Sequence, residues 1–133
     1  MKITSNIPDH ARCVEAVLTG FVACARLLIE ADLIPPFPHD VVGVNYRLEA
    51  PGEEDWKLPF GVITDGWGDC EDLAIWLCAG LHATGEDPDA RCIIVQTGRN
   101  KLHCVVQRGD GTIEDPSVAL MTPQDLKRYT DAG

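Results

Sequence analysis

The sequence lacks the features that mark membrane-spanning, secreted and repeat proteins. No apolar run reaches the ~18 residues that a bilayer-crossing helix needs, because polar residues interrupt the longest candidate, residues 16–29. No apolar stretch follows Lys2, so we expect no signal peptide. The 133 residues contain no internal repeat and no low-complexity segment. This length and composition predict one domain, residues 1–133, around a single hydrophobic core.

Positive charge is scarce. The chain has 11 Lys and Arg against 21 Asp and Glu, a formal net charge of −10. This balance repels phosphate backbones and anionic lipids, so it disfavours nucleic acid and membrane surfaces as partners. It is compatible with basic partners, although solubility alone accounts for it.

No Cys-x-x-Cys pair occurs among the six cysteines, which disfavours a zinc ribbon. The even count would suit a disulfide framework, but the expected absence of a signal peptide and the length of the core favour a reducing compartment. Most of the thiols lie in apolar patterns, where a free cysteine behaves as a small hydrophobe. We therefore expect four of them to be buried and unpaired: Cys13, Cys24, Cys78 and Cys92.

Apolar residues at three- and four-residue spacing predict a first helix from about Pro8 to Asp32, which the prolines of residues 35–38 end. The stretch 39–64 is rich in turn-forming residues and is expected to be irregular, with a short strand over 41–44 as one option.

A second helix is predicted from Cys70 to about Thr84. Asp69 is placed to cap its first turn, and Asp72 completes a pattern that resembles a capping box. Gly85 is a natural residue for its end.

The spacing of apolar residues then changes to one typical of strands. Two runs, 91–96 and 102–107, precede an Asp-Gly hairpin turn, a third strand, 112–115, and a terminal helix from Thr122. This order predicts an α+β fold, with the second helix packed on a small antiparallel sheet. We divide it into an N-terminal helix and irregular loop (1–60), a core (61–118) and a C-terminal helix (119–133).

Cys70 is the first candidate for chemistry. It opens a helix just after two glycines, so its sulfur faces unpaired backbone N–H groups and the positive end of the helix dipole, which favour a thiolate. The flanking carboxyls of Asp69, Glu71 and Asp72 oppose a thiolate, so the net effect stays open.

A cysteine nucleophile needs a base and a group that orients the base. Of the four histidines, His82 lies about 18 Å along the helix axis from Cys70, too far to act. His103 lies on the second strand, and pairing across the hairpin brings it near Val118, within a few residues of Asp115.

These motifs resemble the transglutaminase-like cysteine peptidase superfamily, which has a papain-like fold and small bacterial members. In that superfamily a Cys in a Gly-Asp-Cys-acid-Asp segment opens the core helix, a His follows on one strand and an Asp on the next. The matching residues are Cys70 in Gly-Asp-Cys-Glu-Asp, His103 in Leu-His-Cys-Val-Val and Asp115 in Glu-Asp-Pro-Ser. The resemblance implies that these three form a catalytic triad.

The resemblance covers about residues 60–118, including 89–95, which is similar to the strand before the histidine. Many relatives carry an aromatic residue shortly after the histidine, where this chain has Cys104 and Val105. Small stand-alone members of this type occur in bacterial and phage genomes, which leaves a phage-related assembly role open.

Each residue also has a simpler interpretation. Cys70 could be a buried small residue, His103 a hydrogen-bonded strand residue, and Asp115 a cap for the turn before Pro116. A metal site of Cys70, His103 and Cys104 is disfavoured, because Cys104 should point to the opposite face from His103.

An acyl-transfer site also needs donors for the carbonyl oxygen. The backbone N–H of Cys70 is one. Papain-like enzymes place a Gln shortly before the Cys, and this chain has none there. The candidate side chains for the second donor or for support of Cys70 are those of Trp67, Asn45, Asp69, Trp56 and Tyr46. Trp67 could instead pack between loop and helix, and Asn45 could be a turn residue.

The sequence therefore predicts a cysteine-dependent acyl transferase that acts on an amide, with hydrolysis of a peptide or protein favoured and transfer to an amine, which crosslinks proteins, as an alternative. It predicts no cofactor or metal and a cytoplasmic location, with virion association left open. The alternative from another class is a non-catalytic binding or assembly module on the same fold. Oligomeric state is not predicted.

Overall fold

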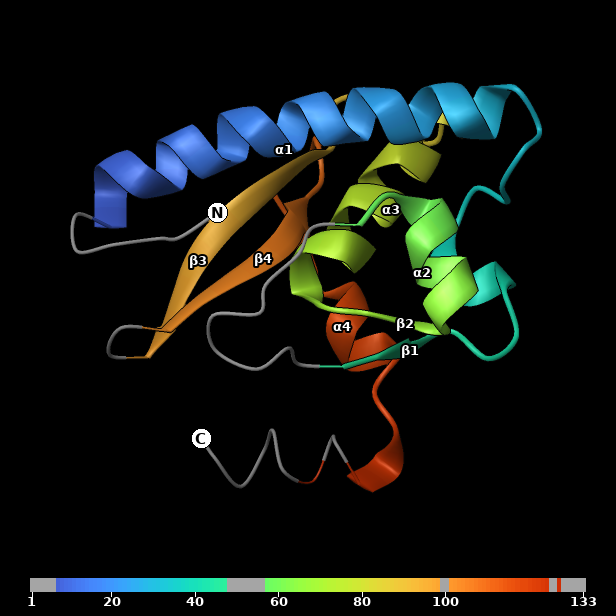
Figure 1. Cartoon of the computed structure of the whole chain (residues 1–133). Coiled ribbons are helices and arrows are strands. Elements are labelled where there is room, and N and C mark those ends of the chain that lie inside the picture. Colours follow the sequence, from blue (N-terminus) through green and yellow to red (C-terminus); the bar gives the residue numbers. More distant parts are fainter. Residues whose placement is uncertain (1–6, 48–56, 99–100, 125–126, 128–133) are drawn as a thin grey trace.

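The computed structural model describes residues 7–47, 57–98, 101–124 and 127. Helices and a small sheet form an α+β arrangement, as expected, with α1 lying across β3 and α3 (Figure 1). In chain order the elements are α1 (Ile7–Glu30), the 3-10 turn η1 (Pro38–Asp40), β1 (Asn45–Tyr46), α2 (Pro59–Asp65), β2 (Trp67–Gly68), α3 (Cys70–Thr84), β3 (Arg91–Gly98), β4 (Lys101–Gln107), β5 (Ile113–Glu114) and α4 (Pro116–Ala119).

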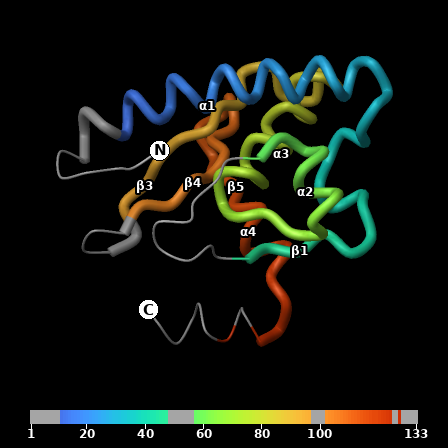
Figure 2. Tube along the Cα trace, viewed as in Figure 1, coloured from blue at the N-terminus to red at the C-terminus, as the bar shows by residue number. Residues whose placement is uncertain are grey.

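Two separate sheets flank α3. The strands β3, β4 and β5 form an antiparallel sheet in that order, and the trace in Figure 2 shows β5 beside β4. The strands β1 and β2 form a two-residue parallel pair in which Tyr46 lies opposite Gly68. Because β2 leads directly into α3, this pair fixes how the chain approaches Cys70.

The helix α3 is the centre of the molecule. Every residue from Leu73 to Leu81 is buried. Its bounds are those predicted, because the Asp69 side chain accepts from the N–H of Asp72 while the Asp72 side chain accepts from the N–H of Asp69. Gly85 ends the helix in the left-handed conformation.

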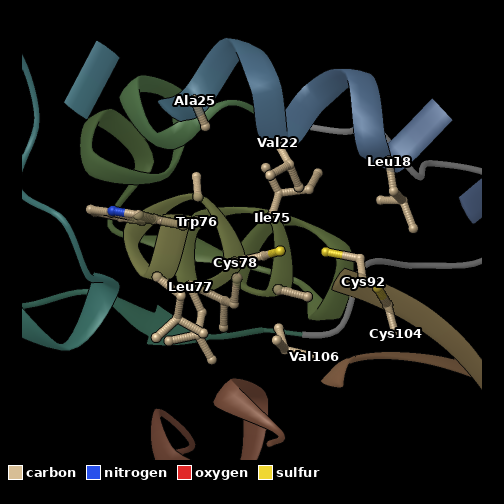
Figure 3. Packing of buried hydrophobic residues seen from close by; sticks show 14 of the residues in the cluster. Leu18, Val22, Ala25, Ile75, Trp76, Leu77, Cys78, Cys92, Cys104 and Val106 are labelled. Atoms are coloured by element: carbon tan, nitrogen blue, oxygen red, sulfur yellow. The ribbon is translucent and has the colours of Figure 1, made fainter. Parts of the chain in front are cut away.

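The core forms where α1 packs on α3. On the inner stripe of α1, Val22 and Ala25 point toward Ile75 and Trp76 of α3, and Leu18 lies farther along the same stripe, on the side of Cys92 (Figure 3). Burial of such side chains stabilises a fold by roughly 1.5–3 kcal/mol each.

The helix α1 also covers the outer edge of β3. The Glu15 carboxylate accepts a hydrogen bond of 2.8 Å from the backbone N–H of Ile94. An unpaired edge donor is thereby satisfied by a side chain instead of by another strand.

Close packing against α3 requires a glycine. A Cβ atom on Gly80 would lie 2.0 Å from the carbonyl oxygen of Pro36 and 2.8 Å from the Phe37 ring. The proline-rich segment therefore crosses directly over the α3 backbone. The Trp76 indole N–H donates to the Pro35 carbonyl at 2.9 Å and holds the same crossing in place.

Two expectations for the middle of the chain are wrong. The stretch 39–64, expected to be irregular, contains most of α2, which Pro59 opens and Gly66 ends at φ 79°. The short strand is β1, not residues 41–44. Its partner β2 is distant in sequence, so local patterns do not reveal the pair. Residues 48–56 of this stretch lie outside the described residues.

The end of the chain also differs. The predicted strand 112–115 is shorter, and its last residue, Asp115, caps a short helix that was not expected, α4. Pro123 and Gln124 are helical, and the remainder of the expected terminal helix lies largely outside the described residues.

The expectation that Cys13 and Cys24 are buried is wrong, since both thiols are exposed and free. Cys13 and Cys24 each immediately precede an inward-facing residue of α1. Successive residues of a helix are rotated by about 100° around its axis, so both thiols lie on the outer face. Cys78 and Cys92 are buried and free, as expected. Among the described residues, no helix has the length and apolarity to cross a membrane.

Candidate active site

Cys70 is the first residue of α3, and 9% of it is exposed. The backbone N–H of Cys104 on β4 donates a hydrogen bond to its sulfur. Because Cys104 directly follows His103, this contact places the thiol against the segment of β4 that carries the candidate base.

His103 and Asp115 form a short contact across the sheet edge. The Nε2 atom of the ring lies 2.7 Å from Oδ2 of Asp115. The other oxygen, Oδ1, accepts from the backbone N–H of Ser117 at 3.0 Å, which makes Asp115 the N-cap of α4. A carboxylate only accepts, so Nε2 carries the proton and the basic lone pair of the neutral ring is on Nδ1.

His103 and Asp115 come close together because β5 ends at Glu114. Val106 pairs with Glu114, one residue from the expected register, and the chain leaves the sheet immediately afterward. Asp115 therefore turns back toward β4 from the start of α4, instead of pairing as a strand residue. Strand pairing alone would have brought His103 opposite a residue farther along the chain.

The electrostatic environment of Cys70 opposes a thiolate in the resting state. Burial raises the pKa of the thiol well above its ordinary value, and the negative charge of Glu71 raises it further. The hydrogen bond from Cys104 acts in the opposite direction but is the smaller effect. The sequence left this balance open, and burial decides it in favour of the neutral thiol.

The neighbouring carboxyls also prefer their neutral forms. Burial and the nearby Asp69 raise the pKa of Glu71 to about 9. Oε2 of Glu71 is buried and receives no hydrogen bond from the described residues. Burial and Asp69 likewise raise the pKa of Asp72 to about 8, although two backbone N–H groups donate to it, Lys57 at 2.7 Å and Asp69 at 3.1 Å.

The candidates upstream of Cys70 have other contacts. The Lys57 ammonium lies 3.1 Å from the Trp67 ring centroid, and the Arg47 guanidinium lies 5.2 Å from it, so the ring is a platform for cations. Asn45 is exposed, and its Nδ2 donates to the Gly43 carbonyl at 3.4 Å. Asp69 serves as the cap of α3. Trp56 lies outside the described residues.

His82, which lies on α3, belongs to a different cluster. The Nε2 atom of His82 lies 2.6 Å from the Ala90 carbonyl and 3.7 Å from the Cys78 sulfur. The sulfur atoms of Cys78 and Cys92 face one another inside the core (Figure 3). This end of α3 carries packing contacts and is remote from Cys70, as the sequence predicted.

Two residues at the site were not singled out by the sequence analysis as its main candidates. Ser117 is fully buried beside Asp115, and its amide holds that carboxylate. Tyr46 of β1 is 8% exposed, whereas Asn45 and Arg47 on either side of it are exposed. The Asp-Pro-Ser segment is a recognisable capping signal, whereas no local pattern indicates that a two-residue strand brings Tyr46 to this place.

Comparison with known proteins leaves the assignment to the geometry: no protein-family model matches the chain, and no curated protein or solved structure matches it.

Proposed function

We propose that the protein is a cysteine-dependent acyl-transfer enzyme that hydrolyses amide bonds of a peptide or protein, with Cys70 as nucleophile, His103 as base and Asp115 as orienting group. The observation that carries this proposal is the 2.7 Å contact between His103 and an Asp115 carboxylate whose second oxygen is itself held by a backbone N–H. Its fold would be of the transglutaminase-like, papain-like type that the sequence motifs resemble.

The first chemical step follows from the protonation states. Nδ1 of His103 takes the thiol proton while the sulfur bonds to the substrate carbonyl carbon, and the charge that forms on the carbonyl oxygen faces the Cys70 N–H. The proton then passes to the leaving amine as the C–N bond breaks, which gives a thioester. Water attacks the thioester in the second half, again with His103 as base.

The raised pKa of Cys70 makes the base essential. A buried thiol that is neutral at rest becomes nucleophilic only when a neighbouring imidazole accepts its proton. Asp115 stabilises the imidazolium that results, as the aspartate of a Ser-His-Asp triad does.

Acetylation by p-nitrophenyl acetate tests the proposal in a Cys13→Ser, Cys24→Ser background, which removes the two exposed thiols. We expect a burst of nitrophenol and an acetyl group on Cys70 by peptide mass spectrometry. His103→Ala should slow the burst by about 100-fold or more, and Asp115→Asn should slow it less, since the base remains.

His39→Ala is the matched control, because His39 is exposed and lies on the η1 turn. It should react at the parent rate. Acetylation of Cys70 at equal rates in the parent and in His103→Ala would contradict the assignment of the base.

The second candidate is a non-catalytic binding or assembly module, and the burial of Cys70 is the observation that favours it. This second function predicts that the parent protein forms no acetyl-enzyme. It also predicts that the His103→Ala and Asp115→Asn variants remain folded. The acylation experiment therefore separates the two functions.

A further inference from the structure

We propose that the hydroxyl of Tyr46 is the second hydrogen-bond donor of the site, aimed at the oxygen of the acyl group that Cys70 attacks. The inference rests on the proposed acyl-transfer function. It assigns a catalytic role to a residue of β1, an element remote in sequence from the Cys70 segment.

The backbone of Tyr46 is held between the two elements that carry the site. On one side it lies opposite Gly68 of β2, two residues before Cys70. The flanking N–H groups donate to the same segment, Asn45 to Gly66 just before β2 at 3.1 Å and Arg47 to Gly68 at 2.9 Å. On the other side the Tyr46 N–H donates to the Leu120 carbonyl at 2.9 Å, just past the end of α4.

The side chain of Tyr46 points inward from this position. It is 8% exposed, whereas Asn45 and Arg47 are exposed, which is the alternation expected of a strand with one buried face. The phenol interacts electrostatically with Cys70, Asp69, Glu71 and Asp115, so it lies amid the groups that begin α3 and α4.

The chemistry of the phenol suits a donor. Burial raises the pKa of Tyr46 above its ordinary value, and the charges of Cys70 and the carboxyls raise it further. The hydroxyl therefore keeps its proton when the thiol loses its own. A neutral donor that faces the developing oxyanion stabilises the transition state without being consumed by it.

The other candidates that the structure describes are less suited to this role. Asp69 is an acceptor engaged in the α3 cap, and Asn45 faces outward. Trp67 is half-buried, whereas Tyr46 is buried. Among the described candidates, Tyr46 is thus the hydrogen-bond donor whose side chain is both buried and electrostatically coupled to the nucleophile.

Two reactions of the same sulfur separate this role from a structural one. Acylation by p-nitrophenyl acetate forms an S–C bond and breaks a C–O bond through an intermediate with charge on the carbonyl oxygen. Alkylation by iodoacetamide forms an S–C bond and breaks a C–I bond, and the charge leaves as iodide. Only the first reaction needs an oxyanion donor.

We expect Tyr46→Phe, in the Cys13→Ser, Cys24→Ser background, to slow acylation of Cys70 by about 100-fold and to leave the alkylation rate within about twofold of the parent. Asn45→Ala, the neighbour on β1 that faces outward, should change neither rate. A near-ultraviolet circular dichroism spectrum and the thermal midpoint check that the Tyr46→Phe variant is folded.

Equal losses in both reactions would show that Tyr46 supports the thiol or the fold, and unchanged rates in both would show that it has no role; either result overturns the inference while the proposed function stands. A parent protein that is alkylated but never acylated overturns the proposed function, and this inference with it.

Discussion

At the scale of single residues, the two oxygens of Asp115 have different partners, the His103 ring and the Ser117 amide. A carboxylate held at both oxygens cannot rotate without losing a contact. The imidazole that it orients is therefore positioned by backbone structure and not by another flexible side chain. This arrangement favours a base whose lone pair points in one direction before substrate arrives.

Glu71 is expected to control the titration of Cys70. Its charge is one of the causes that raise the pKa of the thiol, so replacing Glu71 with Gln removes that opposition and should move the alkylation midpoint of Cys70 to lower pH. Above pH 9, where the parent's Glu71 is ionised, the iodoacetamide rate should rise severalfold in a background without the two exposed thiols. Glu86→Gln, exposed beyond the other end of α3, should match the parent. An unchanged profile for Glu71→Gln would refute this role.

At the scale of elements, α3 is the scaffold on which the other elements are placed. Its first turn holds Cys70, its middle packs on α1, and its last turns lie beneath the proline-rich segment. A change at the far end can therefore affect stability without touching the site.

Glycine substitutions on two helices should have opposite effects. Gly80→Ala places a Cβ 2.0 Å from a Pro36 oxygen, so the crossing segment must move, at a cost of about 1–3 kcal/mol in unfolding free energy. Gly20→Ala on α1 has nothing within 4 Å and should stabilise by about 0.5–1 kcal/mol, because alanine favours helix. Urea unfolding measures both. Similar effects of the two substitutions would contradict the described crossing.

Sequence reasoning succeeded where the information is local. The capping box at Asp69 and the glycine at position 85 predicted both ends of α3 to the residue. The Asp-Gly turn predicted the hairpin that brings Asp115 toward β4, within one residue of its register.

It failed where short elements depend on distant partners. The strand β1 has two residues, too few for a period, and it exists because β2 pairs with it. The positions of Cys13 and Cys24 were wrong for a different reason, since a helix with many small apolar residues has no sharp boundary between its two faces.

At the scale of the whole molecule, acidic groups are both numerous and, near the site, buried. The net charge is −10, while the pKa of Glu71 is raised to about 9 and that of Asp72 to about 8. Folding therefore takes up protons around neutral pH. The protein carries an unfavourable electrostatic contribution that increases as the solution becomes more alkaline.

Stability should consequently fall as pH rises. Both carboxyls are protonated in the folded state and ionised in the unfolded state between about pH 4 and pH 8, so the folded state binds more protons there. Their contribution is fully present below pH 4 and is lost as pH passes through 8 to 9. Urea unfolding at pH 5, 7 and 9 should show decreasing free energies. Glu71→Gln should flatten this dependence and Glu86→Gln should not; a steeper slope in Glu71→Gln would contradict the sign.

The double use of the Asp115 carboxylate links catalysis to the fraying of a four-residue helix. If the first turn of α4 opens, the Ser117 amide loses its acceptor and becomes exchangeable with solvent, and the same event frees the carboxylate that orients His103. The deuterium exchange rate of that one amide therefore reports how often the base is out of alignment, in the resting protein and without any substrate.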